Sequence, residues 1–359
     1  MICSECVGSS LFKYVSHHGS TGFCCYCGKQ RNKVMSVEEL EKWILKAWSY
    51  YYEPAEEFGS SAFDVLAPYD INDLLENLED LELDDANSAF IEKLRIDFDE
   101  IQWFPLGKGE IRGVDEMFYN WETFCNIVKH ERRYFFFDYN LYDYSSSPKS
   151  TLESIVELIH GQEIVTKISP DIKIYRARNF NNNEDVSCLK ATNLGTPKVE
   201  NAIHENRFSP AGISLFYGSL DPNTAREEIG KVDGNIIIGE FHTLTEINVI
   251  DFTALPEIPS IYDEEYRDIS GISFLHDFSA AITSPVDSNS PIDYIPTQVF
   301  TEFIRKKFGE TIKGIKYRSA KSSENSNVVL FYKNEDCVDF DAIFQKKEGV
   351  VLQNFFNFT

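Results

Sequence analysis

Five of the eight cysteines in this chain fall within its first 27 residues, and their spacing constrains the fold more than any other feature. Cys3 and Cys6 are separated by two residues, as are Cys24 and Cys27, and 17 residues lie between the two pairs. This spacing is typical of a zinc site in which two Cys-x2-Cys pairs supply four thiolates to one tetrahedral ion. Four protein ligands fill the coordination shell, so the spacing predicts a small zinc knuckle with a structural Zn²⁺ in residues 1–35.

Neighbouring side chains leave alternatives open at this site. Cys25 lies next to Cys24, where it cannot comfortably share an ion with Cys27, and we interpret it as a spare thiol. His17 and His18 are alternative ligands, although four cysteines make them unnecessary. The remaining interpretation is a set of free cysteines at a disordered terminus.

The net charge of -24 is distributed unevenly along the chain. Residues 1–35 hold four basic and one acidic side chain, residues 36–150 hold 10 and 26, and residues 151–359 hold 20 and 31. Such an acidic chain repels nucleic acid and anionic membranes, so we expect it to bind neither broadly. The basic N-terminal segment leaves a zinc-guided RNA-binding factor as a distant alternative.

The first residues and the length of the apolar runs indicate the cellular compartment of the protein. No apolar run approaches the roughly 20 residues of a membrane-spanning helix. The chain opens on polar residues, so we expect no signal peptide, a cytoplasmic location and reduced cysteines.

Residues 36–150 have the pattern of a helical domain. Ser36 and Glu39 form a capping-box pattern, followed by Leu40, Ile44 and Trp48 on one helical face. Further helices are predicted to start at Asp70 and to span residues 84–98 and 114–128. The ten carboxylates of residues 76–100 are expected to form solvated helix faces, or else a docking surface for a basic partner.

The sequence changes character after residues 145–150, a serine-rich stretch that we interpret as a linker. A helix is predicted from Leu152 to Ile159. Short β-rich runs follow at Ile172–Ala177, Ser214–Tyr217, Ile236–Phe241, Ile247–Phe252, Ile312–Tyr317 and Val328–Tyr332. Helices are predicted at Thr224–Ile229, Tyr262–Ile282 and Thr297–Phe308. This irregular mixture predicts an α+β domain over residues 151–359.

Four polar residues of the C-terminal region could together bind an anionic ligand. Arg176 and Arg207 are suited to phosphate groups, and Tyr217 offers a flat face to a heteroaromatic ring. Glu228, or its neighbour Glu227, could stabilise a cationic sugar transition state. By residue type and spacing alone, surface ion pairs and a core tyrosine explain the same residues equally well.

The order of these residues resembles the RES domain, a family named for arginine, glutamate and serine. The matching positions are Tyr175-Arg176, Arg207 to Gly212, Tyr217, Thr224 to Glu228, Thr297-Gln298, Gly314 to Ser319 and Asn327. The resemblance covers about residues 170–335. Residues 1–150 more faintly resemble the zinc-knuckle and HEPN-like helical unit that precedes some RES domains.

The resemblance implies an ADP-ribosyltransferase-like fold and a toxin that degrades NAD⁺. Arg176, Arg207 and Ser319 would then bind the pyrophosphate and ribose, and Tyr217 would stack on the nicotinamide half. Glu228 would be the catalytic carboxylate, with Tyr217 and Arg207 beside it, and Glu227 stays an alternative.

The resemblance therefore implies an NAD⁺-consuming enzyme that cleaves the nicotinamide–ribose bond and needs no catalytic metal. The acceptor could be water, inorganic phosphate or a protein side chain, and the residues do not choose among them. As a toxin or defence effector the enzyme would need an antitoxin or other regulatory partner. The alternative is a non-enzymatic, partner-binding protein with a degenerate RES pocket.

Overall fold

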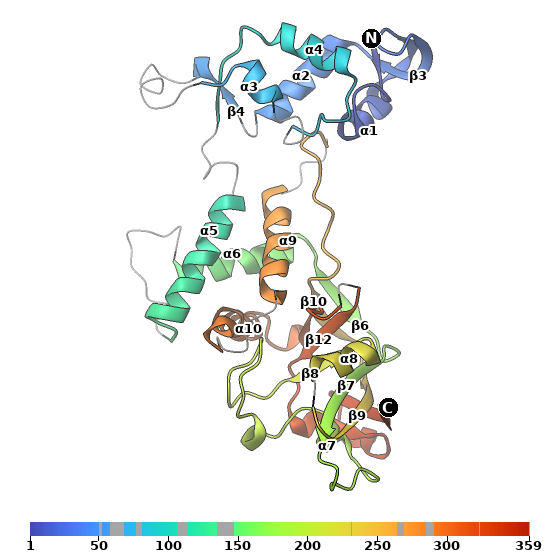
Figure 1. Cartoon of the computed structure of the whole chain (residues 1–359), viewed down its shortest axis with the longest axis vertical. Helices are drawn as coiled ribbons and strands as arrows, with labels where there is room; N and C mark the ends of the chain where they lie inside the picture. The colour runs from blue at the N-terminus through green and yellow to red at the C-terminus, as the bar shows by residue number, and fades with distance from the viewer. Residues whose placement is uncertain are drawn as a thin grey trace. The chain divides into compact units, whose positions relative to one another are not determined.

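The computed structural model describes residues 1–49, 52–57, 68–76, 81–105, 114–134, 147–230, 232–263, 269–284, 291–322 and 324–358 (Figure 1). The chain divides into two compact units. The N-terminal unit comprises Met1–Met117 and Glu257–Ser273, and the C-terminal unit comprises Phe118–Pro256 and Phe274–Thr359. Neither unit is contiguous, because a short segment of the later sequence belongs to the N-terminal unit. The three-part division at residues 35 and 150 stays a prediction.

The N-terminal unit begins with a small antiparallel sheet and a helix. Within the described ranges, its three strands lie in the order β1 (Ile2–Cys3), β3 (Lys29–Met35) and β2 (Ser20–Cys24). Helix α1 (Ser9–His18) connects β1 to β2. Cys3 pairs with Val34 on β3, and Cys24 ends β2 opposite Lys29. This short sheet therefore carries one cysteine of each pair.

Helices follow where the sequence predicted them, with shifted ends. They are α2 (Val37–Trp48), α3 (Ile71–Leu75), α4 (Ser88–Asp97) and the start of α5 (Val114–Asn126), which continues as a π-helical turn over Ile127–Glu131. The Ser36 side chain accepts a hydrogen bond from the backbone of Glu39, as the capping pattern predicted. Asp70 and Asp73 cap α3 reciprocally. Helix α4 begins four residues later than predicted, because Asn87 caps it.

The core of the N-terminal unit joins the sheet to the helices. Leu40, Ile44 and Trp48 on α2 are buried, as their periodicity predicted. They pack with Cys3, Cys6 and Cys24 and with residues of α3 and α4 in one apolar cluster. Strands β4 (Tyr52–Pro54) and β5 (Trp103–Pro105) pair antiparallel beside it. The cysteine-bearing strands and the helices thus share one core.

The C-terminal unit is built on a large mixed sheet. Counting only described residues, nine strands lie in the order β13-β14-β9-β7-β8-β12-β11-β10-β6. Their bounds are β6 (Val165–Ile168), β7 (Ile174–Phe180), β8 (Phe216–Ser219), β9 (Asn235–Thr243), β10 (Ile247–Asp251), β11 (Gly314–Arg318), β12 (Ser326–Leu330), β13 (Cys337–Asp339) and β14 (Val350–Asn357). Most neighbours are antiparallel, while β10 with β11 and β13 with β14 are parallel. The α+β prediction for this region is confirmed, and β6, β13 and β14 were not predicted.

Strands β7 and β8 meet over a very short ladder near the middle of the sheet. Their recorded register is the single pair Tyr175 and Ser219. Gly218 permits this approach, because a Cβ built there would lie 2.5 Å from Ile174 Cγ2 and 3.2 Å from the Tyr175 carbonyl oxygen. The predicted site residues Arg176 and Tyr217 lie directly beside this junction.

Among the described residues, five helices lie wholly or partly in the C-terminal unit after α5. They are α6 (Pro148–Gly161), α7 (Ala191–Leu194), α8 (Pro222–Glu228), α9 (Ile269–Thr283) and α10 (Ile295–Phe308). Short 3-10 turns in this unit span Val199–Asn201, Pro291–Tyr294, Gly309–Thr311, Asn334–Asp336 and Phe340–Gln345. One more, Ala55–Glu57, lies in the N-terminal unit.

Two predictions about these helices need correction. Residues 147–150, expected in a linker, instead start α6, since the Ser147 side chain accepts a hydrogen bond from the backbone of Ser150. Residues 145–146 of that linker lie outside the described residues. Tyr262, predicted to begin a long helix, lies in a turn of the N-terminal unit, where its ring is buried.

Candidate functional site

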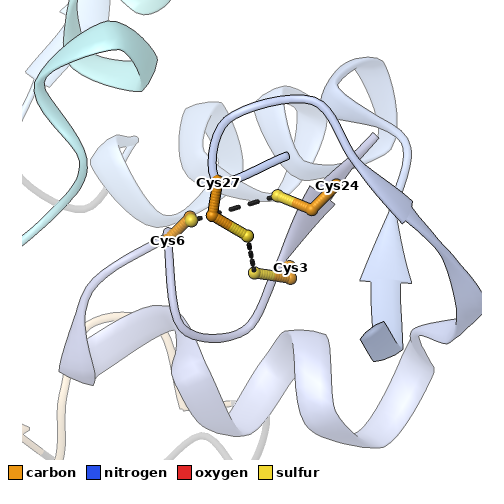
Figure 2. A group of neighbouring side chains, drawn as sticks. All are labelled: Cys3, Cys6, Cys24 and Cys27. Carbon is orange, nitrogen blue, oxygen red and sulfur yellow. Dashed lines mark hydrogen bonds between the residues drawn. The ribbon is translucent and has the colours of Figure 1, made fainter. Parts of the chain in front are cut away.

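The four predicted metal ligands converge in the N-terminal unit. The Sγ atoms of Cys3, Cys6, Cys24 and Cys27 all lie within 4.8 Å of one another. Figure 2 shows their side chains pointing toward a common centre. Cys3 ends β1 and Cys6 lies in the turn that follows it, while Cys24 ends β2 and Cys27 lies in the turn before β3. Gly28 has a φ of 66° at the second turn, which a residue without a side chain adopts at little cost.

The spacing of the sulfur atoms fits a tetrahedral ion. With zinc–sulfur bonds of about 2.3 Å, the edge of a tetrahedron is about 3.8 Å. The Sγ atoms of Cys3 and Cys27 are 3.8 Å apart, and those of Cys24 and Cys6 are 3.9 Å apart. Four cysteines near the N-terminus can therefore bind one metal ion.

The residues around this cluster show which candidate ligands lie within it and which lie outside it. Arg31 forms an ion pair of 2.6 Å with Glu5 and also bonds to Cys27. That hydrogen bond lowers the pKa of the Cys27 thiol to about 6, which favours the thiolate. Cys25 is exposed and lies outside the cluster, as expected of a spare thiol. His17 Nδ1 instead lies 3.0 Å from the Lys13 carbonyl oxygen within α1.

A second polar cluster forms in the C-terminal unit around Glu228, at the end of α8. Glu228 Oε1 accepts hydrogen bonds from Ser319 Oγ at 2.8 Å and from Asn327 Nδ2 at 2.7 Å. Ser319 and Asn327 are 5% and 4% exposed, so both donors are fixed by the surrounding protein. Glu227 and Glu228 are both exposed, but the two hydrogen bonds are made by Glu228 and not by Glu227.

Two residues that the site prediction omitted belong to this cluster. Asn327 was part of the sequence pattern but was given no role, although it holds Glu228 directly. Tyr317 pairs with Asn327 in the register of β11 and β12. Burial raises the pKa of Tyr317. Tyr217 and Glu228 raise it further, whereas Arg207 lowers it. Its position on a buried, alternating strand was the signal that could have identified it.

Tyr217 supports the loop that carries Arg207. The Tyr217 hydroxyl accepts a hydrogen bond from the backbone of Phe208 at 3.2 Å and lies 3.0 Å from Ser209 Oγ. Gln298 Nε2 donates to the Asn206 carbonyl at 2.9 Å and so ties the same loop to α10. Burial raises the pKa of Tyr217 to about 12, so its hydroxyl stays protonated at neutral pH.

The two predicted arginines both donate hydrogen bonds to backbone carbonyl oxygens. Arg176 Nη1 donates to the Tyr217 carbonyl, while Arg176 Nε is buried and has no hydrogen-bond partner among the described residues. Burial lowers the pKa of Arg176 to about 9, which still leaves it cationic at neutral pH. Arg207 donates through Nη1 to the Ile282 carbonyl and through Nη2 to the Ser284 carbonyl at 2.9 Å. Arg207 thereby caps the C-terminal end of α9.

Arg178, on the same strand as Arg176, has a structural role. It donates to the carbonyl oxygens of Leu194 and Gly195 at 3.4 and 2.5 Å, at the end of α7. Arg178 therefore caps that helix, and these hydrogen bonds do not involve the Glu228 cluster.

A cavity of about 390 Å³ adjoins Ser319. Its lining includes Arg318, Ser319, His276, Ser279 and Ser284, from the end of β11 and from α9. This volume lies within the range of about 300–1,000 Å³ that is usual for small-molecule pockets. A larger hollow of about 880 Å³ beside Trp103 is lined by residues of the N-terminal unit.

These features describe an α+β protein with a four-cysteine cluster in one unit and a carboxylate site between strands in the other. Comparison with family models agrees with that description. The model for HEPN/RES N-terminal domain 1 matches residues 17–141, and the model for the RES domain matches residues 174–349. The chain therefore contains a RES domain preceded by a HEPN/RES N-terminal domain. The resemblance inferred from the sequence is confirmed.

No curated protein matches the chain. Over the residues that the structure describes, every helix is too short or too polar to cross a lipid bilayer.

Proposed function

We propose that the C-terminal unit is an NAD⁺-consuming enzyme that cleaves the bond between nicotinamide and ribose. RES domains are generally linked to NAD⁺-related toxin activity, and the match covers the whole Glu228 cluster. The observation that carries the proposal is Glu228 held by Ser319 and Asn327 next to a cavity. Two buried donors fix the carboxylate in one orientation before the substrate arrives, which favours electrostatic catalysis.

The arginines supply the binding part of this mechanism. Arg176 and Arg207 would attract the pyrophosphate of NAD⁺, since guanidinium groups bind phosphate oxygens through paired N–H donors. The unpaired Nε of Arg176 supports this role, because a buried donor without an acceptor is costly and an anionic oxygen would satisfy it. The unpaired Oδ1 of Asn327 could likewise accept a hydrogen bond from a ribose hydroxyl. Tyr217 would bind beside the nicotinamide half and keep the Arg207 loop in place.

The chemical step breaks the bond between C1′ of the ribose and the nicotinamide nitrogen. The electron pair of that bond leaves with nicotinamide, and the ribose acquires the character of an oxocarbenium ion. The Glu228 carboxylate would stabilise this positive charge. An acceptor oxygen then attacks C1′, and the acceptor is water for hydrolysis, inorganic phosphate for phosphorolysis, or a protein side chain for ADP-ribosyl transfer.

The role of Glu228 can be tested by measuring nicotinamide release from NAD⁺ by the purified chain. Replacing the carboxylate with an amide in Glu228→Gln should lower the rate at least ~100-fold, the usual cost of losing one well-placed electrostatic group. The matched control is Glu227→Gln, on the same helix but outside the cluster, which should stay within about threefold of the wild type. Equal rates for both variants and the wild type would contradict the assignment. Adding inorganic phosphate and identifying the ADP-ribose product then distinguishes the acceptors.

A non-enzymatic role remains as a second candidate, supported by the bonds of Arg207. Its Nη1 and Nη2 atoms already donate to carbonyl oxygens of the chain itself. In that case the C-terminal pocket would be degenerate and the protein would act through a bound partner. Absence of nicotinamide release by the wild type, together with absence of NAD⁺ binding, would favour this candidate.

The cysteine cluster completes the proposal for the whole chain. We propose that Cys3, Cys6, Cys24 and Cys27 bind a structural Zn²⁺, which stabilises the N-terminal unit and takes no part in the reaction. A chain that depletes NAD⁺ would act in the cytoplasm as a toxin or defence effector. It would require restraint by an antitoxin or another regulatory protein.

A further inference from the structure

Arg207 lies in a tight turn of the C-terminal unit, residues 206–209. The backbone N–H of Asn206 donates to the Ser209 carbonyl at 2.8 Å, and the N–H of Ser209 donates back to the Asn206 carbonyl at 3.2 Å. Phe208, beside Arg207, is 1% exposed, and its ring meets that of Tyr317 edge-on at 4.8 Å. These contacts close the turn, but its orientation also depends on the element that binds its carbonyl oxygens.

Gln298 on the first turn of α10 binds both ends of this turn. Its Nε2 donates to the Asn206 carbonyl at 2.9 Å and lies 3.4 Å from the Ser209 carbonyl. The Gln298 side chain is 6% exposed. Water therefore competes little with these bonds, and one amide group connects α10 to the start and the end of the turn.

Thr297, the preceding residue, binds the middle of the turn. Its hydroxyl donates to the Arg207 carbonyl and also lies 2.9 Å from the Tyr294 carbonyl. Thr297 is 7% exposed. Two consecutive side chains of α10 thus bind the backbone of Arg207 and of the residues around it.

Helix α10 is a firm support for these bonds because its inner face is packed in the core of the C-terminal unit. Phe300 and Ile304 are fully buried, and Phe303 is nearly so. The ring of Phe300 meets that of Phe278 edge-on at 5.0 Å. Packed side chains of this kind fix a helix in one position.

The guanidinium of Arg207 is fixed at its other end as well. Nη1 and Nη2 donate to the carbonyl oxygens of Ile282 and Ser284, which also belong to the C-terminal unit. A guanidinium carries more N–H donors than these two bonds use, so donors remain for an anionic ligand. A side chain that is ordered at both ends loses little entropy when it binds such a ligand.

We propose that Thr297 and Gln298 are positioning residues for Arg207, and that they act by fixing the 206–209 turn on α10. Without them the turn keeps its two backbone bonds and its bond to the Tyr217 hydroxyl, so the fold survives. Arg207 then loses its fixed orientation. That the ligand is NAD⁺ rests on the proposed function, whereas the positioning itself does not.

Steady-state kinetics with NAD⁺ test this role in the full-length chain. Gln298→Leu and Thr297→Val keep the size of each side chain but lose its donor. Each should raise KM about tenfold and leave kcat within about threefold, because Arg207 binds the substrate and Glu228 is untouched. Thr297→Ser keeps the hydroxyl and should stay close to the wild type. The matched control is Thr301→Val, since the Thr301 hydroxyl donates only within α10, to the Thr297 carbonyl.

A double-mutant cycle shows whether Gln298 acts through Arg207. Gln298→Leu should raise KM at least ~5-fold in the wild type but less than about twofold in Arg207→Gln, where there is no guanidinium left to position. Equal increases in the two backgrounds would contradict the proposal, because they would mean that Gln298 affects NAD⁺ binding by another route.

Hydrogen exchange provides a readout that does not depend on activity. Gln298→Leu and Thr297→Val should raise amide exchange at least ~5-fold in residues 205–210, while β9 and β12 keep their wild-type exchange. Thr301→Val should leave all of these segments unchanged. Wild-type exchange in residues 205–210 of both variants, or an equal rise in β9, would show that the two side chains do not position this turn.

The outcomes keep this inference apart from the proposed function. If the wild type releases no nicotinamide from NAD⁺, the proposed function fails, while hydrogen exchange still decides whether Thr297 and Gln298 fix the turn. If the wild type acts on NAD⁺ but the variants match it in KM and exchange, only the positioning role is wrong. Should Gln298→Leu not fold, the comparison of Thr297→Val with Thr297→Ser decides it by the same two measurements.

Discussion

At the residue scale, the candidate site contains polar atoms that the chain itself does not satisfy. Arg176 Nε and Asn327 Oδ1 are buried without hydrogen-bond partners in the part of the chain that is described. Native proteins rarely leave buried donors and acceptors unpaired, because each one costs about 1–3 kcal/mol of stability. One is a donor and the other an acceptor, which matches a ligand that carries both phosphate and hydroxyl groups.

A carboxyl group elsewhere shows how burial makes stability depend on pH. Glu41 on α2 is near Asp97 on α4, and burial followed by a hydrogen bond to Asp97 raises the pKa of Glu41 to about 7. Lys93 opposes this shift and Glu38 adds to it, while the hydrogen bond from Glu41 lowers the pKa of Asp97. The folded unit therefore prefers Glu41 protonated. Because the pKa is raised on folding, this contribution is complete below the unfolded pKa of about 4.5 and is lost as the pH rises through about 7.

We expect the melting temperature of the N-terminal unit to fall between about pH 5 and pH 7, the range between the two pKa values of Glu41. Glu41→Gln, which resembles the protonated acid, should remove most of this dependence and be more stable than the wild type at pH 8. Tryptophan fluorescence is a suitable probe, because Trp43, Trp48 and Trp103 belong to this unit. Glu38→Gln, an exposed change on the same helix, should keep the wild-type slope. Identical slopes for the wild type and Glu41→Gln would show that Glu41 is not the group that titrates.

At the element scale, the short contact between β7 and β8 is the most sensitive point of the sheet. Gly218→Ala would place a methyl group 2.5 Å from Ile174 Cγ2 and force the strands apart. We expect a loss of ~1–3 kcal/mol in the free energy of unfolding, as for other overpacked sites. NAD⁺ binding should weaken as well, because Arg176 and Tyr217 flank this contact.

Gly161→Ala is the matched control for that substitution. Gly161 ends α6, and a Cβ there would meet no atom within 4 Å. Alanine favours a helix over glycine by up to ~1 kcal/mol, so unfolding should be unchanged or slightly harder. Chemical denaturation of both variants measures the difference. Similar losses in the two variants would mean that the close approach of β7 and β8 is not what Gly218 provides.

At the scale of the whole molecule, we expect the proposed zinc ion to stabilise more of the N-terminal unit than the four cysteines and their turns. Cys3, Cys6 and Cys24 lie in the same apolar cluster as Trp48 and Tyr262. We expect chelation of the ion to lower the melting temperature of the N-terminal unit by at least ~10 °C, since structural zinc contributes several kcal/mol of folding free energy. Amide exchange in residues 257–263, whose Ile261 and Tyr262 belong to the same cluster, should rise together with that change.

Two cysteine variants test which thiols hold the ion. Cys3→Ser should reduce the zinc content well below one ion per chain, as measured by elemental analysis. Cys25→Ser, at the exposed cysteine outside the cluster, should bind zinc as the wild type does. A full zinc content in Cys3→Ser would show that another residue completes the shell.

The sequence by itself determined the local elements and the chemistry they carry. The spacing of the cysteine pairs predicted a converging cluster, because two residues between ligands fix their reach within one turn. Apolar periodicity predicted α2, α8 and α10 and most of the central strands, because each of these elements buries a face whose period appears in the sequence. The order of the arginine, tyrosine, glutamate and serine positions identified the RES family.

Only the tertiary structure decided which distant groups meet. Glu228 bonds to Ser319 and Asn327 across roughly a quarter of the chain, and no local pattern distinguishes it from Glu227 in that respect. Tyr262 has the local pattern of a helix residue and follows strands of the C-terminal unit in the sequence. Yet it is buried beside Trp48 in the N-terminal unit. The physical reason is the same in both cases. Periodicity records that a side chain is buried, whereas its partner is selected by packing between segments that the sequence places far apart.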